Sequence, residues 1–218
     1  EIFEKGKNLF GLDKSALSIR KKDYAVVVEG YFDVMALHDS GITNVVASLG
    51  TALSSNQITL LSRSTDSKKI LLNFDSDNAG IRAANRAISE VENLAIQGQL
   101  DLRVLQLPLG KDPDEFLKDN SPSEYEALAA KSPLWMDWQI DQSLKDLDLN
   151  KSDQFQEAVS TLVSLLGKLP QTAIRTHYLQ KVAQRLSGGQ ARFALQLEED
   201  LRNQISGQRW HGRSKKYD

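Results

Sequence analysis

The sequence predicts an α/β domain built on a parallel sheet, followed by an all-α helical domain. From residue 23 to about residue 120, short β-branched apolar runs alternate with helical patterns. This alternation is typical of parallel strands that are joined by right-handed crossovers. From about Ser121 onward the strand signal disappears, and only helical periodicity remains. A chain of 218 residues is long enough for one or two domains with apolar cores.

The first zone predicts four strands and three helices in alternation. Strand patterns occur at residues 24–28, 44–47, 69–74 and 100–107. Helical patterns occur between them, at about residues 32–40, 54–63 and 80–97. Ser54 is a typical helix N-cap, and Gly41, Gly98 and Pro108 are typical residues at the end of an element.

The second zone predicts helices only, and the whole chain then divides into four parts. Helices are expected to begin near Ser121 and Ser132 and to cover about residues 152–167, 171–187 and 192–205. The expected division begins with a leading segment that follows an earlier subdomain (residues 1–22) and a sheet domain (23–120). A helical subdomain (121–205) and a basic flexible tail (206–218) follow.

Composition excludes several classes of protein. The chain has no cysteine, which excludes disulfides, thiol nucleophiles and cysteine-based zinc sites. It has no apolar run of about 18 residues, so no transmembrane helix and no membrane partner are expected. It begins without Met or an apolar signal region, and we expect a fragment of a longer chain. Both ends are basic around an acidic centre, which suits a metal-dependent enzyme acting on polyphosphates or nucleic acid, although charge alone favours solvated tails.

Acidic residues follow three of the predicted strands. Glu29 comes directly after residues 24–28, Asp75 and Asp77 follow residues 69–74, and Asp112 and Asp114 follow the fourth strand. Ligands of an open parallel sheet bind beyond the carboxyl ends of its strands, so these acids are expected at one edge. A single acid there is often a helix N-cap, but Glu is a poor one.

A cluster of carboxylates at this edge predicts a divalent cation. Mg²⁺ takes one or two carboxylates and completes its shell with water and phosphate oxygens. Without a cation, clustered carboxylates repel one another and raise their own pKa values. Separately solvated acids explain one strand end well and three strand ends poorly. No P-loop and no G-x-S-x-G elbow occurs in the sequence.

Two further features leave alternatives open. Residues 48–51, after the second strand, are equally compatible with a phosphate-contacting turn and a plain turn. Three tryptophans could stack on bases, but Trp135 and Trp138, three residues apart on a helix, fit a core or an interface better.

Four motifs together carry a family resemblance. They are Glu29-Gly-Tyr-Phe-Asp33, Ala47-Ser-Leu-Gly-Thr51, Phe74-Asp-Ser-Asp77 with Ala79-Gly80, and Lys111-Asp-Pro-Asp114. In this order and spacing they resemble the Toprim fold, and more closely the catalytic core of the bacterial replicative DNA primases of the DnaG type. The segments Ile2–Gly6 and Thr176–Ala183 resemble that family's approach to the Toprim domain and its helical subdomain. The resemblance covers about residues 1–190.

The resemblance implies a nucleotidyltransferase, a DNA-directed RNA polymerase that makes short primers for DNA replication. By matching position, it implies catalytic and metal-binding roles for Glu29, Asp75 and Asp77, a further metal ligand at Asp112, and secondary acids at Asp33 and Asp114. It also implies nucleic-acid or nucleotide contacts from Lys5 and Arg82. Two positions depart from the pattern, because Ser76 stands where Gly is commoner and Asn78 where a basic residue is frequent.

The resemblance also implies cofactors, partners and a cellular place. These are Mg²⁺ or Mn²⁺ with no zinc in this segment, a single-stranded DNA template, ribonucleoside triphosphates, and the replicative helicase through a following C-terminal domain. The expected place is the bacterial cytoplasm, at the replisome. Without the preceding half of the polymerase core, the fragment alone is expected to prime weakly or not at all. Two other classes stay open: another Toprim enzyme, as a nuclease or topoisomerase fragment, and a non-catalytic module that binds metal or nucleic acid.

Overall fold

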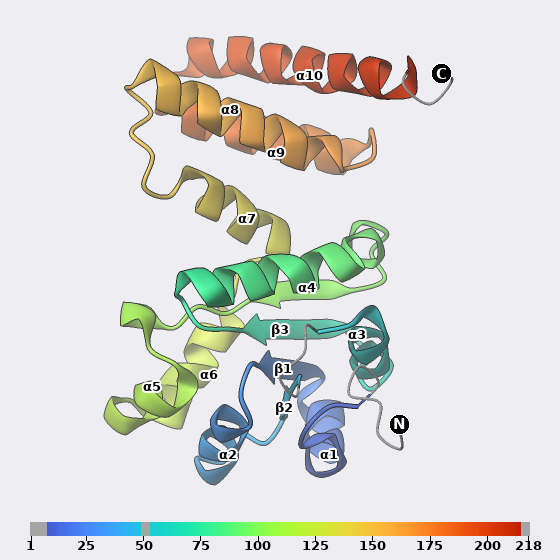
Figure 1. Cartoon of the computed structure of the whole chain (residues 1–218), viewed down its shortest axis with the longest axis vertical. Helices are drawn as coiled ribbons and strands as arrows, with labels where there is room; N and C mark the ends of the chain where they lie inside the picture. Colours follow the sequence, from blue (N-terminus) through green and yellow to red (C-terminus); the bar gives the residue numbers. More distant parts are fainter. Residues whose placement is uncertain (1–7, 49–52, 215–218) are drawn as a thin grey trace. The chain divides into compact units, whose positions relative to one another are not determined.

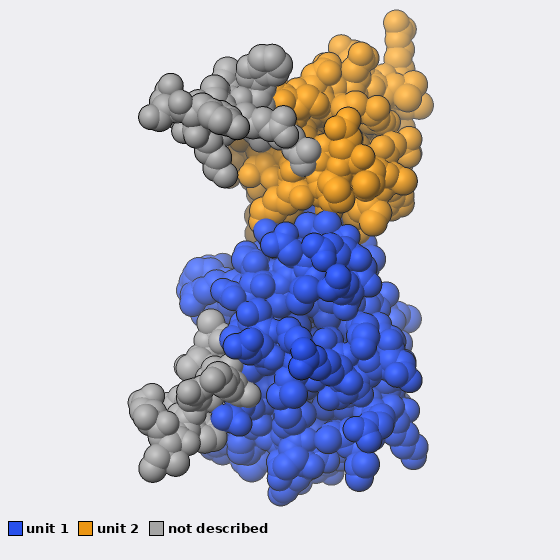
Figure 2. Space-filling view, turned by 90° about the vertical axis from the view of Figure 1, so that its right-hand side faces the viewer, with its two compact units in different colours: residues 1–138 blue, residues 139–218 orange. Residues whose placement is uncertain are grey.

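The computed structural model describes residues 8–48 and 53–214, and the side chains of all of these except Leu109 and residues 208–214. The chain forms two compact units, Glu1–Trp138 and Gln139–Asp218, which are coloured separately in Figure 2. The composition changes earlier, near Ser121, because helices that follow the last strand still belong to the unit that contains the sheet.

The first unit contains the parallel sheet that the alternating pattern predicts. Its four strands are β1 (Tyr24–Val28), β2 (Val45–Ala47), β3 (Lys69–Asn73) and β4 (Asp101–Val104), in the order β2-β1-β3-β4. All three pairings are parallel, and Val28 lies opposite both Ala47 and Asn73. The predicted fold class is therefore confirmed. β1 and β3 are buried over their last four residues because helices cover the sheet.

The crossover helices form where the sequence predicts them. They are α2 (Tyr31–Asp39), α3 (Ser55–Ser62) and α4 (Asn78–Ile96). Ser54 is the N-cap of α3, and its side chain accepts a hydrogen bond from the Gln57 N–H at 3.3 Å. α2 packs against β1 and β2, α3 against β3 and α4, and α4 against β4 (Figure 1).

Three parts of the first unit differ from the expectation. Residues 12–22, expected as part of a leading segment, form the helix α1 (Leu12–Lys22), which buries Ser15 and Ile19. The fourth strand ends at Val104, and Leu107 instead leads into the short 3₁₀ helix η2 (Pro108–Gly110). The seven-residue helix α5 (Pro113–Asp119), which the sequence pattern does not predict, then precedes α6 (Pro122–Ala130).

Helix α7 (Trp135–Leu144) crosses the boundary between the units, and the second unit continues with α8 (Ser152–Gly167), α9 (Ala173–Leu186) and α10 (Ala191–Ser214). The predicted apolar stripes are buried at Leu162, Leu166, Val182 and Leu186, among others.

Two details at this end of the chain bear on the expectations. Trp135 and Trp138 are buried, which confirms the core interpretation. Helix α10 continues to Ser214, although a flexible tail was expected from residue 206. Among the helices that the structure describes, none is both long and apolar enough to cross a membrane.

Candidate functional site

The acids that follow the strands lie at one edge of the sheet. Glu29 follows β1 directly, and Asp75 lies two residues beyond the end of β3. Because Val28 and Asn73 are paired in register, the two carboxyl ends are adjacent. The arrowheads of β1 and β3 point to the side on which α5 lies (Figure 1), and the N-cap of α5 is Asp112. The structure therefore brings together acids from three separate parts of the sequence.

Backbone hydrogen bonds hold two of these carboxylates at the edge. The Asp75 N–H donates to Glu29 Oε1 at 3.2 Å, which links the ends of β1 and β3. The Gly30 N–H donates to Asp33 Oδ2 at 3.2 Å, which closes a turn at the start of α2. Each carboxylate keeps lone pairs that these bonds do not use.

Two of the predicted metal ligands are also helix N-caps. Asp77 Oδ1 accepts from the Gly80 N–H at 2.8 Å at the start of α4. Asp112 Oδ1 accepts from the Glu115 N–H at 2.7 Å at the start of α5. Capping and metal binding are compatible here, because one oxygen of each carboxylate makes the cap bond and the other is left for a second partner. The caps also orient both side chains.

The electrostatics of the edge show that the acids are crowded. Burial is the largest cause that raises the pKa of Glu29, Asp33 and Asp75, and for Asp33 the pKa rises to about 6. Neighbouring carboxylates add to each shift: Asp75 and Asp77 act on Glu29, and Asp112 and Asp75 act on Asp33. A cation bound among these groups would favour their charged forms.

The remaining candidate residues take different places. Asp114 adds to the repulsion on Asp33 but forms an ion pair with Lys118, at 2.7 Å. Arg82 is exposed on α4. Lys5 lies outside the described residues, as do residues 49–51 of the Ala47–Thr51 motif.

Glu115 is an acid that the sequence interpretation missed. It lies in the first turn of α5, and its charge raises the pKa of Asp75. The available signal was a third acid directly after Asp112-Pro-Asp114.

The donor set fits a hard divalent cation. All the groups are carboxylates, which Mg²⁺ prefers, and their mutual repulsion is the condition that a cation relieves. Among residues 8–48 and 53–214, no three acidic or histidine side chains converge as a ready-made metal centre. Mg²⁺ does not require one, because one or two carboxylates with water and substrate phosphates complete its shell.

Gly80 allows the chain to fold tightly around Asp75. A Cβ placed on Gly80 would lie 2.0 Å from the Asp75 carbonyl oxygen and 2.7 Å from its carbon. Both contacts are far too short for real atoms, so only glycine fits at this position. The Gly80 N–H also makes the cap bond to Asp77, and this one residue therefore sets the geometry of both acids of the D-x-D pair.

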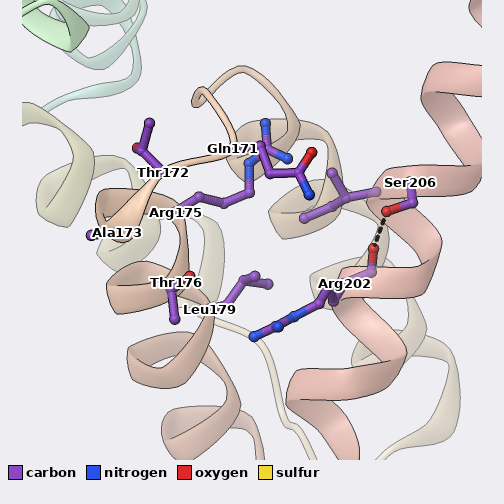
Figure 3. Close-up of a pocket in the computed structure, with 9 residues that line it drawn as sticks. Gln171, Thr172, Ala173, Arg175, Thr176, Leu179, Arg202 and Ser206 are labelled. Atoms are coloured by element: carbon purple, nitrogen blue, oxygen red, sulfur yellow. Dashed lines mark hydrogen bonds between the residues drawn. The ribbon is translucent and has the colours of Figure 1, made fainter.

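The second unit carries a pocket of about 270 Å³ with a different chemistry (Figure 3). Arg175 and Arg202 line it together with the polar residues Gln171, Thr172, Thr176 and Ser206. None of its lining residues is acidic, so this pocket offers no carboxylate site for a metal.

Two family profiles match the chain. Residues 26–117 match the Toprim-like family, and residues 136–191 match the DnaB-helicase binding domain of primase. The second match lies within the chain, on α7 to α9, whereas the family resemblance placed the helicase contact in a following domain. The first match contains every acidic residue predicted for the site.

The curated relatives of this chain are named DNA primase. The chain is 61% identical over 217 residues to a DNA primase of Synechococcus elongatus, covering 100% of this chain and 31% of that protein. It is 44% identical over 207 residues to a DNA primase of Synechocystis, covering 94% of this chain and 33% of that protein. The chain thus spans about a third of the length of these relatives.

Solved structures agree in fold. A DNA primase domain from Pseudomonas aeruginosa superposes with a TM-score of 0.69 at 32% identity, covering 91% of this chain and 61% of that one. The DnaG primase catalytic domain bound to single-stranded DNA superposes with a TM-score of 0.68 at 29% identity, covering 86% and 58% of the two chains. With the Toprim-like sheet and its acidic edge, these matches show that the chain belongs to the bacterial DNA primases of the DnaG type.

Proposed function

We propose that this chain supplies the metal-binding acidic site of a DNA primase, an enzyme that joins ribonucleotides into short primers on a single-stranded DNA template. The observation that carries the proposal is the set of carboxylates from β1, β3 and α5 at one edge of the sheet. A primase acts in the bacterial cytoplasm, at the replication fork, and we place this protein there.

The acidic residues divide into principal metal ligands and additional ligands that helix-cap bonds orient. Glu29 and Asp75 lie at the ends of adjacent strands, so they are our principal ligands for Mg²⁺ or Mn²⁺. Asp77 and Asp112 add oxygens that their cap bonds orient. When bound, a divalent cation would offset the negative charge of the triphosphate and of the attacking hydroxyl. The protein's own contribution is position, because phosphoryl transfer depends mainly on alignment and charge.

The second unit is the proposed contact for the replicative helicase. Its helices α7 to α9 match the helicase-binding profile over residues 136–191. We propose this placement in preference to a contact formed wholly by a following domain.

Charge-neutral substitutions test the catalytic proposal. Asp75→Asn and Asp77→Asn, made in a protein extended to the length of its relatives, are expected to abolish primer synthesis, because both remove a metal-binding charge with little change in shape. Asn is as good an N-cap as Asp, so Asp77→Asn keeps the start of α4. The matched control is Asp39→Asn, an exposed acid at the far end of α2.

The outcomes separate the proposal from its alternatives. Primer synthesis that survives both substitutions at Asp75 and Asp77 would exclude a catalytic role and favour a non-catalytic binding module. Metal-dependent cleavage of DNA without primer synthesis would favour a Toprim nuclease or topoisomerase.

A further inference from the structure

The first turn of α2 exposes large apolar side chains next to the acidic site. Tyr31 is 51% exposed, Phe32 is 65% exposed, and Met35, one turn further on, is 44% exposed. Tyr31 and Phe32 come directly after Glu29 and Gly30, and Asp33 follows them. Contiguous exposed apolar surface commonly marks a binding site, and here it begins two residues from a proposed metal ligand.

The aromatic side chains form an ordered row. The ring centroids of Tyr31 and Phe32 are 4.4 Å apart, and those of Phe10 and Tyr31 are 6.0 Å apart in an edge-to-face arrangement. Phe10 is anchored by two backbone hydrogen bonds with Ala47, at 2.9 and 3.2 Å. Because Ala47 is the last residue of β2, the row runs along the same carboxyl edge of the sheet as the acids.

The edge therefore has an acidic part and an aromatic part that meet at the start of α2. The carboxylate of Asp33 interacts with Asp75 and Asp112, while Tyr31 and Phe32 occupy the same helical turn. The acids can hold a cation, and through that cation the phosphates of a nucleotide, but they offer no surface on which a base can stack. Aromatic rings stack on any of the four bases because every base has a π-face, which suits an enzyme that must accept all of them.

We propose that Phe32, supported by Tyr31, is a stacking platform for the base of the nucleotide whose phosphates occupy the acidic site. The inference rests on the proposed function and adds a positioning element to it. The occupant is a nucleobase, because the platform adjoins a site for phosphates. A protein segment that covers Phe32 and Met35 by apolar contact is the competing occupant.

Calorimetry of this chain with Mn²⁺ and two ligands tests the platform. ATP carries a base and a ribose, and inorganic tripolyphosphate carries a chain of three phosphates without either. The unsubstituted chain is expected to bind ATP more tightly than tripolyphosphate, by roughly five- to hundredfold, the usual range for one stacked base. Phe32→Ala is expected to weaken ATP binding to the level of tripolyphosphate and to leave tripolyphosphate binding unchanged.

Two replacements and one control separate stacking from general apolar contact. Phe32→Trp keeps an aromatic face and is expected to preserve ATP binding, whereas Phe32→Leu is expected to weaken it as Phe32→Ala does. Leu17→Ala removes another apolar side chain, 79% exposed on α1, and is expected to leave the affinity for both ligands unchanged. Retention of tight ATP binding in Phe32→Leu would overturn stacking in favour of apolar contact.

Failure of the platform and failure of the proposed function give different results. Equal affinity of the unsubstituted chain for ATP and tripolyphosphate would reject the platform and leave the acidic site intact. Absence of Mn²⁺-dependent binding for both ligands would reject the acidic site, and the platform with it. Asp75→Asn is expected to weaken the binding of both ligands, whereas no substitution of Phe32 is expected to weaken the binding of tripolyphosphate.

Discussion

Replacing Gly80 by Ala is expected to damage both stability and catalysis through one steric contact. The added Cβ would lie 2.0 Å from the Asp75 carbonyl oxygen and 2.8 Å from the Asp75 nitrogen, whereas real Cβ contacts essentially never fall below 3.0 Å. The backbone at Asp75 or the start of α4 must therefore move by about 1 Å. Overpacking of this kind typically costs about 1–3 kcal/mol of stability. A displacement of about 1 Å in a catalytic group can lower the rate about 100-fold.

Two assays measure these effects, and a second glycine provides the control. Urea unfolding of the chain gives the loss of stability, and primer synthesis by the protein extended to its relatives' length gives the loss of rate. Gly207→Ala is the matched change, because Gly207 is exposed on α10 and has no neighbour within 4 Å of an added Cβ. It is expected to leave priming unchanged and to stabilise the helix by up to about 1 kcal/mol. Normal priming by Gly80→Ala would refute the claim that the Asp75 backbone position matters.

Substitutions at three other residues have defined outcomes. Because the folded-state pKa of Asp33 is raised to about 6, its stabilising contribution is present below about pH 4 and lost as the pH rises through 6. In EDTA, Asp33→Asn should thus be more stable than the unsubstituted chain above pH 6, by about 1–2 kcal/mol after solvent screening, and equal to it at pH 3–4; a pH-independent difference in urea titrations would contradict this. Tyr125→Phe removes a buried hydroxyl that donates to Asn73 Oδ1 at 2.7 Å, and it should cost about 1–3 kcal/mol in urea unfolding. Asp77→Ala should destabilise the chain by about 0.5–2 kcal/mol through loss of the α4 cap, whereas Asp77→Asn should not, and equal stability of the two variants would argue against the cap.

Local sequence signals predicted most of the sheet and its crossover helices. The continuous apolar run Ala25–Val28 indicates a strand that is buried on both faces, and the structure buries all four residues. The end of β4 was not predictable in this way, because Leu105 and Leu107, which follow the strand, are as apolar and as buried as its residues. The strand ends at Val104 because its pairing with β3 ends there, and this pairing depends on tertiary structure.

The acidic edge was predictable because parallel strands end at a common side. Glu29, Asp75 and Asp112 could therefore be grouped without knowing which strands are neighbours. In the sequence, a helix N-cap was only the alternative to a metal ligand. In the structure, Asp77 and Asp112 cap helices and also lie at the acidic edge.

Two contacts that depend on tertiary structure were beyond a local pattern. The approach of Gly80 to the Asp75 carbonyl depends on how the loop after β3 closes onto α4. The row that joins Phe10 to Tyr31 depends on the pairing of Phe10 with Ala47. Gly80 belongs to the same motif as Asp75, but the motif does not reveal the close approach, and the contact between Phe10 and Tyr31 has no motif at all.

Titration calorimetry with Mn²⁺ tests the central claim, that the acids of β1, β3 and α5 form one metal-binding site. The unsubstituted chain is expected to bind Mn²⁺, and Asp75→Asn is expected to abolish that binding, because the charge of Asp75 acts on Glu29 and the charge of Asp112 acts on Asp75. Asp39→Asn, an exposed control on α2, is expected to bind as the unsubstituted chain does. Equal Mn²⁺ binding by the unsubstituted chain and Asp75→Asn would place the metal elsewhere and contradict the site.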